Sequence, residues 1–168
     1  MDPMEQVFIG IGSNQGDSAG ICRDAVGALD RTGSVRVLRM SSLYRSKPVG
    51  VLDQDWFVNG VASCETDLEP LELLDRVLEI EKAFGRRRLV RWGPRTLDLD
   101  LLCYGRRRVD HWRLTIPHPR LHRRLFVLVP LAEIAPDWVH PVRQLTARQL
   151  IDQLMKQDHD QVVVPLAG

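Results

Sequence analysis

Segments with the apolar periodicity of strands and of helices follow one another in the order β-α-β-β-α-β along the first 104 residues. The helical segments are the most regular, with apolar stripes over residues 21–29 and 73–84. Gly33 and Gly85 stand where these helices are expected to end. Alternation, or a short apolar run bounded by turn-forming residues, marks the strands. We therefore expect strands at residues 6–11, 35–44, 56–66 and 97–104.

This order is that of the ferredoxin-like α+β plan, in which an antiparallel sheet carries the helices on one face. After residue 104 the chain is interrupted by prolines from Pro117 to Pro141. Two more helices are expected in this C-terminal extension, near residues 123–133 and 146–156. Because the 168 residues contain no internal repeat and no linker, we expect a single domain over residues 1–168.

Composition argues against a membrane protein or a secreted one. No apolar run approaches the roughly 18 residues that a membrane span needs. The first residues, Met-Asp-Pro-Met-Glu-Gln, lack the basic and apolar regions of a secretory signal. Three cysteines, an odd number, lie far apart in apolar stretches, so we interpret Cys22, Cys64 and Cys103 as reduced core thiols. These features predict a cytoplasmic protein without a membrane partner.

The net charge of +1 hides a strongly basic segment. Between Arg86 and Arg124 there are twelve arginines and three aspartates. A local positive field of this kind favours an anionic ligand. The runs 86–88 and 106–108 can equally be solvated arginines with no ligand. The excess alone does not distinguish a nucleotide from a phosphorylated metabolite or a nucleic acid.

Leucine and aspartate alternate from Leu97 to Leu101. In a strand the leucines point to one face, and Asp98 and Asp100 point to the other, about 6.6 Å apart. A carboxylate pair on a rigid strand suits Mg²⁺, which prefers carboxylate oxygens, waters and substrate phosphates. Taken alone, the pair also fits a polar edge facing solvent. Arginines 91 and 95 directly precede it, however, and guanidinium groups match phosphate oxygens.

Other motifs argue against several common sites. The chain has no P-loop and no protein-kinase signature, and the glycines of residues 10–16 miss the dinucleotide spacing by one residue. That segment is predicted to be a tight turn lined by polar groups. His118 and His122 are four residues apart, but Pro117 and Pro119 disfavour the helix that a zinc pair needs. A neutral His118 that donates to a phosphate or caps a loop is the better interpretation.

Phe57 and Asn59 share one face of the strand predicted at residues 56–66. An aromatic ring beside an amide with donor and acceptor ends is suited to binding a flat heterocycle. This strand is therefore a candidate for the substrate site.

The most specific motif is RWGPRTLDLD at residues 91–100. Five others are collinear with it: FIGIGSN at 8–14, SLYRS at 42–46, FVNG at 57–60, LTIPH at 114–118 and PLAEIAP at 130–136. Together, over residues 6–141, they resemble the 6-hydroxymethyl-7,8-dihydropterin pyrophosphokinase family of folate synthesis. The resemblance implies a ferredoxin-like fold and an attack of the pterin hydroxymethyl oxygen on the β-phosphorus of ATP, which releases AMP.

The resemblance also implies residue roles, with ATP as co-substrate and two Mg²⁺ ions. Asp98 and Asp100 would bind both ions, and Arg86 and Arg95 would contact the triphosphate as catalytic residues. Trp92, in a loop expected to move, would close over the site. Contacts to ATP would come from Glu81, Arg88, Trp92, Arg113, His118 and Arg124. The pterin would be bound by Ser46, Lys47, Pro48, Val49, Phe57, Asn59 and Phe126, with the two phenylalanines on either side of its ring.

Two alternatives remain open from the residues alone. One is an RNA-binding module, because RNA-recognition domains share the β-α-β-β-α-β order, although their aromatic signature is absent here. The other is a different two-metal phosphotransferase or nuclease on the same plan. The family resemblance favours ATP and hydroxymethyldihydropterin as ligands, no nucleic acid, and a monomer.

Overall fold

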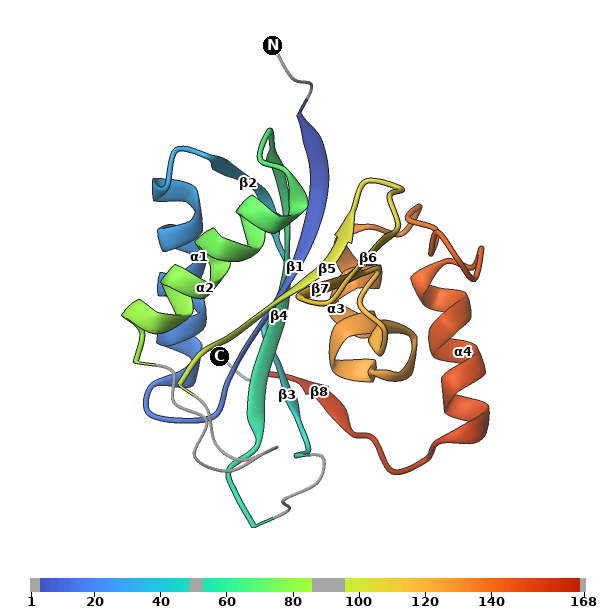
Figure 1. Ribbon diagram of the computed structural model, residues 1–168. Helices are drawn as coiled ribbons and strands as arrows, with labels where there is room; N and C mark the ends of the chain where they lie inside the picture. Colours follow the sequence, from blue (N-terminus) through green and yellow to red (C-terminus); the bar gives the residue numbers. More distant parts are fainter. Residues whose placement is uncertain (1–3, 49–52, 86–95, 167–168) are drawn as a thin grey trace.

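The computed structural model describes residues 4–48, 53–85 and 96–166, and its centre is a six-stranded antiparallel sheet (Figure 1). The strands follow the order β5-β1-β4-β3-β8, and β2 pairs with β4 beside β3. This places the first and third predicted strands at the centre of the sheet, as the ferredoxin-like plan requires. The strands are β1 (Glu5–Ser13), β2 (Val35–Met40), β3 (Tyr44–Ser46), β4 (Phe57–Thr66), β5 (Asp98–Tyr104) and β8 (Val163–Pro165).

The single strand expected at residues 35–44 is in fact two strands, β2 and β3, separated by a bend. At the bend, the backbone N–H of Ser41 donates to the Val61 carbonyl (2.9 Å), and Ser41 Oγ accepts from the Val61 N–H (2.9 Å). The Ser41 hydroxyl, rather than a backbone carbonyl, therefore accepts from the Val61 N–H at this point beside β4. Gly60 lies beneath the bend, where an added methyl group would be 2.7 Å from Met40 Cε.

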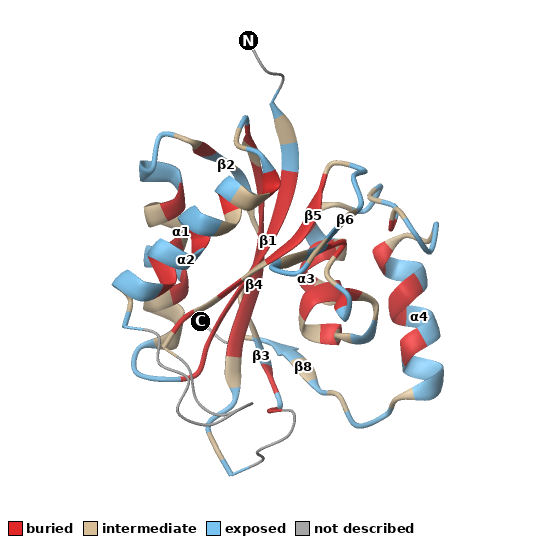
Figure 2. Ribbon diagram, viewed as in Figure 1, coloured by how far each residue is buried: buried red, intermediate tan, exposed pale blue. Residues whose placement is uncertain are grey.

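Helices α1 (Ser18–Arg31) and α2 (Pro70–Ala83) cover one face of the sheet (Figures 1 and 2). Asp17 caps α1 by accepting from the Gly20 N–H (3.2 Å). At the start of α2, Glu69 and Glu72 form a reciprocal capping box, and Pro70 occupies the first turn. The apolar stripes of α1 and α2 pack on inward-facing residues of the sheet, among them Val7, Ile9, Ile11, Cys64, Leu99 and Leu101, and on Leu97 just before β5.

The C-terminal extension covers the opposite face (Figure 1). It contains a 3₁₀ turn, η1 (Leu121–Arg123), and helices α3 (Leu125–Ile134) and α4 (Ala147–Gln157). Both helices lie close to their expected positions. The hairpin of β6 (Val109–His111) and β7 (Leu114–Ile116), and the edge strand β8, were not predicted.

The predicted fold class, α+β with helices packed on an antiparallel sheet, is confirmed. The interpretation of the three cysteines as unpaired core thiols is also confirmed. Cys22, Cys64 and Cys103 are buried and free, and burial raises the pKa of each thiol to about 12. Within the described ranges, no helix is both long enough and apolar enough to span a bilayer.

Candidate active site

Strand β5 presents its two aspartates on the face opposite its leucines, as the alternation predicts. Leu97, Leu99 and Leu101 are at most 5% exposed, whereas Asp98 and Asp100 are partly exposed. Asp98 pairs with Gly12 and Asp100 with Gly10 on the neighbouring strand β1. Directly paired residues project to the same face of a sheet. The surface beside the carboxylates is therefore formed by glycines, which contribute no side chain.

Asn59 lies in the same cross-strand row as Asp98, because Gly12 pairs with Asp98 on one side and with Asn59 on the other. Its side chain lies against β1, where an added methyl group on Gly12 would be 3.0 Å from Asn59 Nδ2. Ser46 Oγ donates to Asn59 Oδ1, and both residues are buried. The hydrogen bond fixes the amide with its oxygen toward β3 and its nitrogen toward β1.

Phe57 joins this group, since it pairs with Ser46 at the end of the β3–β4 ladder. The phenyl ring is partly buried. Phe57, Asn59 and Ser46 are thus neighbours on the face that carries Asp98, with an aromatic ring, an oriented amide and a hydroxyl in one place.

Arg124 brings a cation to the carboxylates. It is the N-cap of α3, its Nη1 lies 3.8 Å from Asp100 Oδ2, and its guanidinium lies 5.4 Å from the centre of the Phe126 ring. Its side chain is 20% exposed, and burial lowers its pKa while Asp100 and Asp98 oppose that shift. The start of α3 therefore contributes both a charged and an aromatic group to this face.

His118 is held neutral beside these groups. Its Nδ1 accepts from the backbone N–H of Arg120 (3.1 Å), so the single proton of the neutral ring is on Nε2. Burial first, and then Arg124 and Arg120, lower the pKa of His118 to about 4, against an opposing effect of Asp98. An imidazole in this state is a hydrogen-bond donor without a formal charge.

The donor set fits magnesium better than zinc. Within residues 4–48, 53–85 and 96–166, no three His, Cys, Asp or Glu side chains form a group able to hold a metal ion. Asp98 and Asp100 offer oxygen ligands on one strand face. Mg²⁺ binds through one or two carboxylates and completes its shell with waters and substrate phosphates, whereas structural zinc needs four protein ligands.

This arrangement of an aspartate pair, a basic helix start and an aromatic–amide group agrees with a family-level match. The model of the family described as 7,8-dihydro-6-hydroxymethylpterin-pyrophosphokinase matches residues 8–136, more than half of the chain. The chain belongs to this family. Membership confirms the pyrophosphokinase function in folate biosynthesis that the sequence motifs predicted, and it decides against the RNA-binding module and the other two-metal enzymes.

Comparison with individual proteins agrees with this family assignment. The chain is 49% identical to a 2-amino-4-hydroxy-6-hydroxymethyldihydropteridine pyrophosphokinase of Synechocystis sp. over 87% of this chain and 74% of that protein. Identity to the enzyme of the same name from Haemophilus influenzae is 44%, over 97% and 99% of the two chains. A solved structure of wild-type Plasmodium falciparum HPPK-DHPS has a TM-score of 0.72 at 13% identity, and it shows the fold alone. This chain covers 46% of that longer one.

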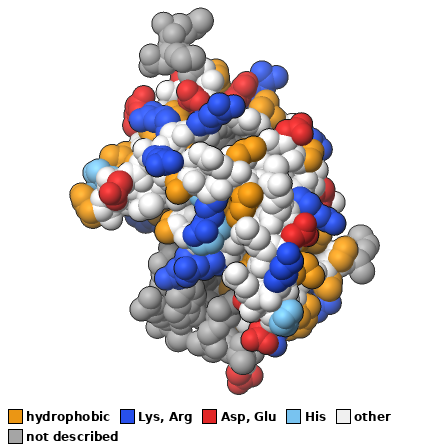
Figure 3. All heavy atoms as spheres, turned by 90° about the vertical axis from the view of Figure 1, so that its right-hand side faces the viewer, with side chains coloured by type: hydrophobic (Ala, Val, Ile, Leu, Met, Phe, Trp, Pro, Cys, Tyr) orange, Lys and Arg blue, Asp and Glu red, His pale blue; other side chains and the backbone are white. Residues whose placement is uncertain are grey.

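The described surface of this pyrophosphokinase carries side chains of both charges. On the side of the molecule that carries α3 and α4, basic and acidic side chains are interspersed (Figure 3).

Two predicted ATP ligands make contacts within the protein. Glu81 is 4% exposed on the α1/α2 side of the sheet, and its Oε2 accepts from the Leu99 N–H (2.8 Å) on β5. Arg113 lies in the turn between β6 and β7, and its Nη2 is 2.6 Å from Asp75 Oδ1 of α2. Contact of either residue with ATP stays a prediction.

The remaining candidates divide into two groups. Lys47 is exposed and donates its N–H to the Val162 carbonyl (3.1 Å), while Pro48 is buried beside it. The other predicted positions lie outside the described residues: Val49, Arg86, Arg88, Trp92 and Arg95.

The turn after β1 contains contacts that sequence reasoning did not identify. Asn14 Nδ2 donates to Gln54 Oε1 (2.8 Å) and to the Asp55 carbonyl (3.1 Å), just before Phe57. Gln15 Oε1 accepts from Thr96 Oγ1 (3.3 Å), just before Asp98. The turn therefore joins the start of β4 to the start of β5. The polar run after a buried strand was the only signal in the sequence.

Proposed function

We propose that this chain transfers diphosphate from ATP to 6-hydroxymethyl-7,8-dihydropterin at the face formed by β5, β1, β4 and the start of α3. The supporting observation is the cross-strand row that places Asp98 and Asn59 on either side of Gly12. An anion-binding end and a heterocycle-binding end then lie side by side. This is the arrangement that a phosphoryl acceptor with a flat ring requires.

The pterin end consists of an oriented amide between aromatic rings. The Asn59 amide, fixed by Ser46, would hydrogen-bond the ring edge. Phe57 and Phe126 would contact the two faces of the ring. Backbone groups of Lys47, Pro48 and Val49 would hydrogen-bond the remaining edge of the pterin. The flat substrate is then recognised both on its ring faces and on its polar edge.

The phosphate end consists of two carboxylates and several cations. Asp98 and Asp100 would hold two Mg²⁺ ions, which when bound neutralise charge on the phosphate oxygens. Arg124 and neutral His118 would donate to the polyphosphate from the α3 side. Arg86 and Arg95 would contact the transferring group. Further ATP contacts are assigned to Glu81, Arg88, Trp92 and Arg113.

In the reaction, the pterin hydroxymethyl oxygen forms a bond to the β-phosphorus, and the bond from that phosphorus to the α,β-bridging oxygen breaks. AMP leaves with the bridging oxygen, and the hydroxyl loses its proton. Asp100 is the carboxylate that we assign to help accept this proton. Such a transfer depends on positioning and on cations more than on a strong base.

The test is product analysis with matched variants. Wild-type protein with Mg²⁺ and ATP should release AMP rather than ADP, and only when hydroxymethyldihydropterin is present. Asp98→Ala and Asp100→Ala should each reduce turnover by about a thousandfold. Asp110→Ala, an exposed aspartate in β6, is the matched control and should keep wild-type turnover. Near-normal turnover of the two site variants would disprove the metal assignment.

We further propose that the protein acts as a monomer in the cytoplasm. Three free buried thiols agree with a reducing compartment. Light scattering of the purified protein tests the first statement, and fractionation of the producing cells tests the second.

A further inference from the structure

We propose that Glu133, at the last turn of α3, is a positioning residue that ties α3 to strand β3 and so fixes the distance between the two sides of the pterin site. This inference rests on the proposed function. Among the described residues, the Glu133 carboxylate hydrogen-bonds Ser42 and Tyr44, neither of which is assigned to catalysis or to substrate binding. Its effect would therefore pass through the elements that it joins.

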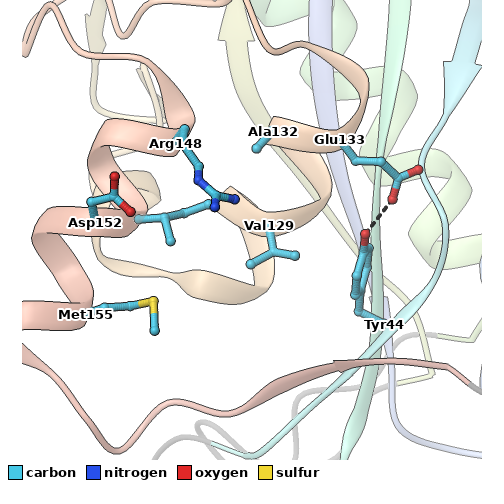
Figure 4. Close-up of a pocket in the computed structure, with 8 residues that line it drawn as sticks. Tyr44, Val129, Ala132, Glu133, Arg148, Asp152 and Met155 are labelled. Atoms are coloured by element: carbon cyan, nitrogen blue, oxygen red, sulfur yellow. Dashed lines mark hydrogen bonds between the residues drawn. The ribbon is translucent and has the colours of Figure 1, made fainter.

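The Glu133 carboxylate accepts three hydrogen bonds from the segment that leads into β3. Its Oε2 accepts from the Ser42 N–H (2.8 Å) and from Ser42 Oγ (3.2 Å), and its Oε1 accepts from Tyr44 Oη (2.5 Å). Figure 4 shows the Tyr44–Glu133 bond between the strand and the helix. One side chain thus holds both ends of the Ser42–Tyr44 segment.

This segment leads directly to the pterin candidates. Tyr44 pairs with Asn59 in the β3–β4 ladder, and Ser46 follows two residues later and fixes the Asn59 amide. At the other end of α3, Phe126 lies in the first turn. A displacement of α3 along β3 would therefore change the spacing between Phe126 and Asn59.

The hydrogen bonding within helix α3 is interrupted near its middle. Pro130 lies within the helix and has no N–H, so the Phe126 carbonyl loses its usual helical donor. The interruption lies between the substrate end of α3 and its last turn.

Packing around Tyr44 and Glu133 is also incomplete. A hollow of about 460 Å³ opens between α3 and α4, with Tyr44 and Glu133 among its lining residues (Figure 4). Dispersion contacts across a hollow of this size are weak. Hydrogen bonds therefore matter more for the position of α3 at this point.

A cation supports the same connection from β2. Arg39 Nη1 donates to the Ile134 carbonyl (3.0 Å), one of the last carbonyls of α3. Burial raises the pKa of Glu133, but the bonds from Tyr44 and Ser42 and the charge of Arg39 outweigh it and hold the pKa below its ordinary value. The carboxylate is therefore ionised at neutral pH and accepts all three hydrogen bonds.

The experiment measures the KM for pterin and the KM for ATP separately. Glu133→Ala should raise the pterin KM about fivefold to tenfold, since three hydrogen bonds at an exposed site are lost. Tyr44→Phe removes one of the three hydrogen bonds and should raise the pterin KM about twofold to threefold. Glu133→Gln keeps one acceptor oxygen, and its pterin KM should lie between those of Glu133→Ala and Tyr44→Phe. The ATP KM and kcat should stay within about twofold of wild type in all three variants.

The control is Glu65→Ala, which removes an acidic side chain paired with Arg36 (3.4 Å) at the other end of β4. It should leave both KM values unchanged. An unchanged pterin KM in Glu133→Ala and Tyr44→Phe overturns the inference, and so does a parallel rise of both KM values with a lowered Tm. Wild-type AMP formation in the same assay reports on the proposed function independently.

Discussion

The guanidinium of Arg124 lies 3.8 Å from the carboxylate of Asp100, although the two residues come from different layers of the fold. Asp100 is on the edge strand β5, and Arg124 is the residue at which α3 begins. At 20% and 30% side-chain exposure, both groups are partly shielded from water, which strengthens charge interactions. The same pair of groups can hold a metal-bound polyphosphate between them.

Arg124→Ala should lower kcat/KM for ATP by roughly tenfold to a hundredfold, because a cation beside the transferring phosphates is lost. Arg124→Lys should recover part of this loss, since it restores the charge without the planar fork. Steady-state kinetics with varied ATP provide the measurement. Arg123→Ala, an exposed neighbour, is the control and should match wild type. Equal behaviour of the two alanine variants would exclude Arg124 from phosphate binding.

Asn59→Ala should raise the pterin KM by tenfold or more, since a buried amide that recognises the ring is removed. Ser46→Ala should produce a smaller increase, because it only frees the amide to rotate. Ser63→Ala provides the comparison, as Ser63 is a buried serine of β4 whose hydroxyl accepts from Gln6 Nε2 (3.1 Å). It is expected to change stability but not the pterin KM. The prediction fails if the ATP KM rises as much as the pterin KM in Asn59→Ala.

Local patterns predicted the parts of the site that lie on single strands. Asp98 and Asp100 could be assigned to one face because a strand buried on its other face has a period of two. The same reasoning placed Phe57 with Asn59. In both cases two residues that are two positions apart in the sequence carry the whole signal.

Contacts between distant segments could not be predicted in the same way. The Arg124–Asp100 approach depends on the path of residues 117–124 across the sheet, and no periodicity encodes that path. The strand at 35–44 looked continuous because its break depends on hydrogen bonds between Ser41 and Val61 of another strand. Strand β8 has only three residues, too few for a pattern, and exists because β3 offers it an edge.

Glu81 offers a test that separates a structural role from a role in ATP binding. Glu81→Leu removes the acceptor of the Leu99 N–H and should destabilise the fold by about 1–3 kcal/mol, as measured by urea unfolding. Glu81→Gln keeps an acceptor oxygen and should lose less stability than Glu81→Leu. If Glu81 also binds ATP, the glutamine variant will raise the ATP KM even where its stability is close to wild type. An unchanged ATP KM in Glu81→Gln would show that Glu81 has a structural role and does not bind ATP.

Acid should destabilise the protein through His118, which is partly buried, and His140, which is buried. Burial lowers the pKa of His118 and of His140 from 6.5 to about 4, with nearby arginines contributing to both shifts. Between pH 6.5 and 4 the unfolded chain therefore binds protons that the folded chain does not. The free energy of unfolding is fully present above pH 6.5 and should fall as the pH is lowered toward 4.

Urea unfolding at several pH values between 7 and 4.5 measures this dependence. His118→Gln and His140→Gln should each show a shallower fall than wild type, because one titrating group is removed. His159→Gln, at an exposed position near the C-terminus, should keep the wild-type slope. Parallel curves for all four proteins would show that other groups, such as carboxylates, cause the acid sensitivity. A pH profile of kcat/KM tests His118 as a neutral donor, since an imidazole that stays uncharged down to about pH 4 contributes no ionisation to kcat/KM near pH 6.5.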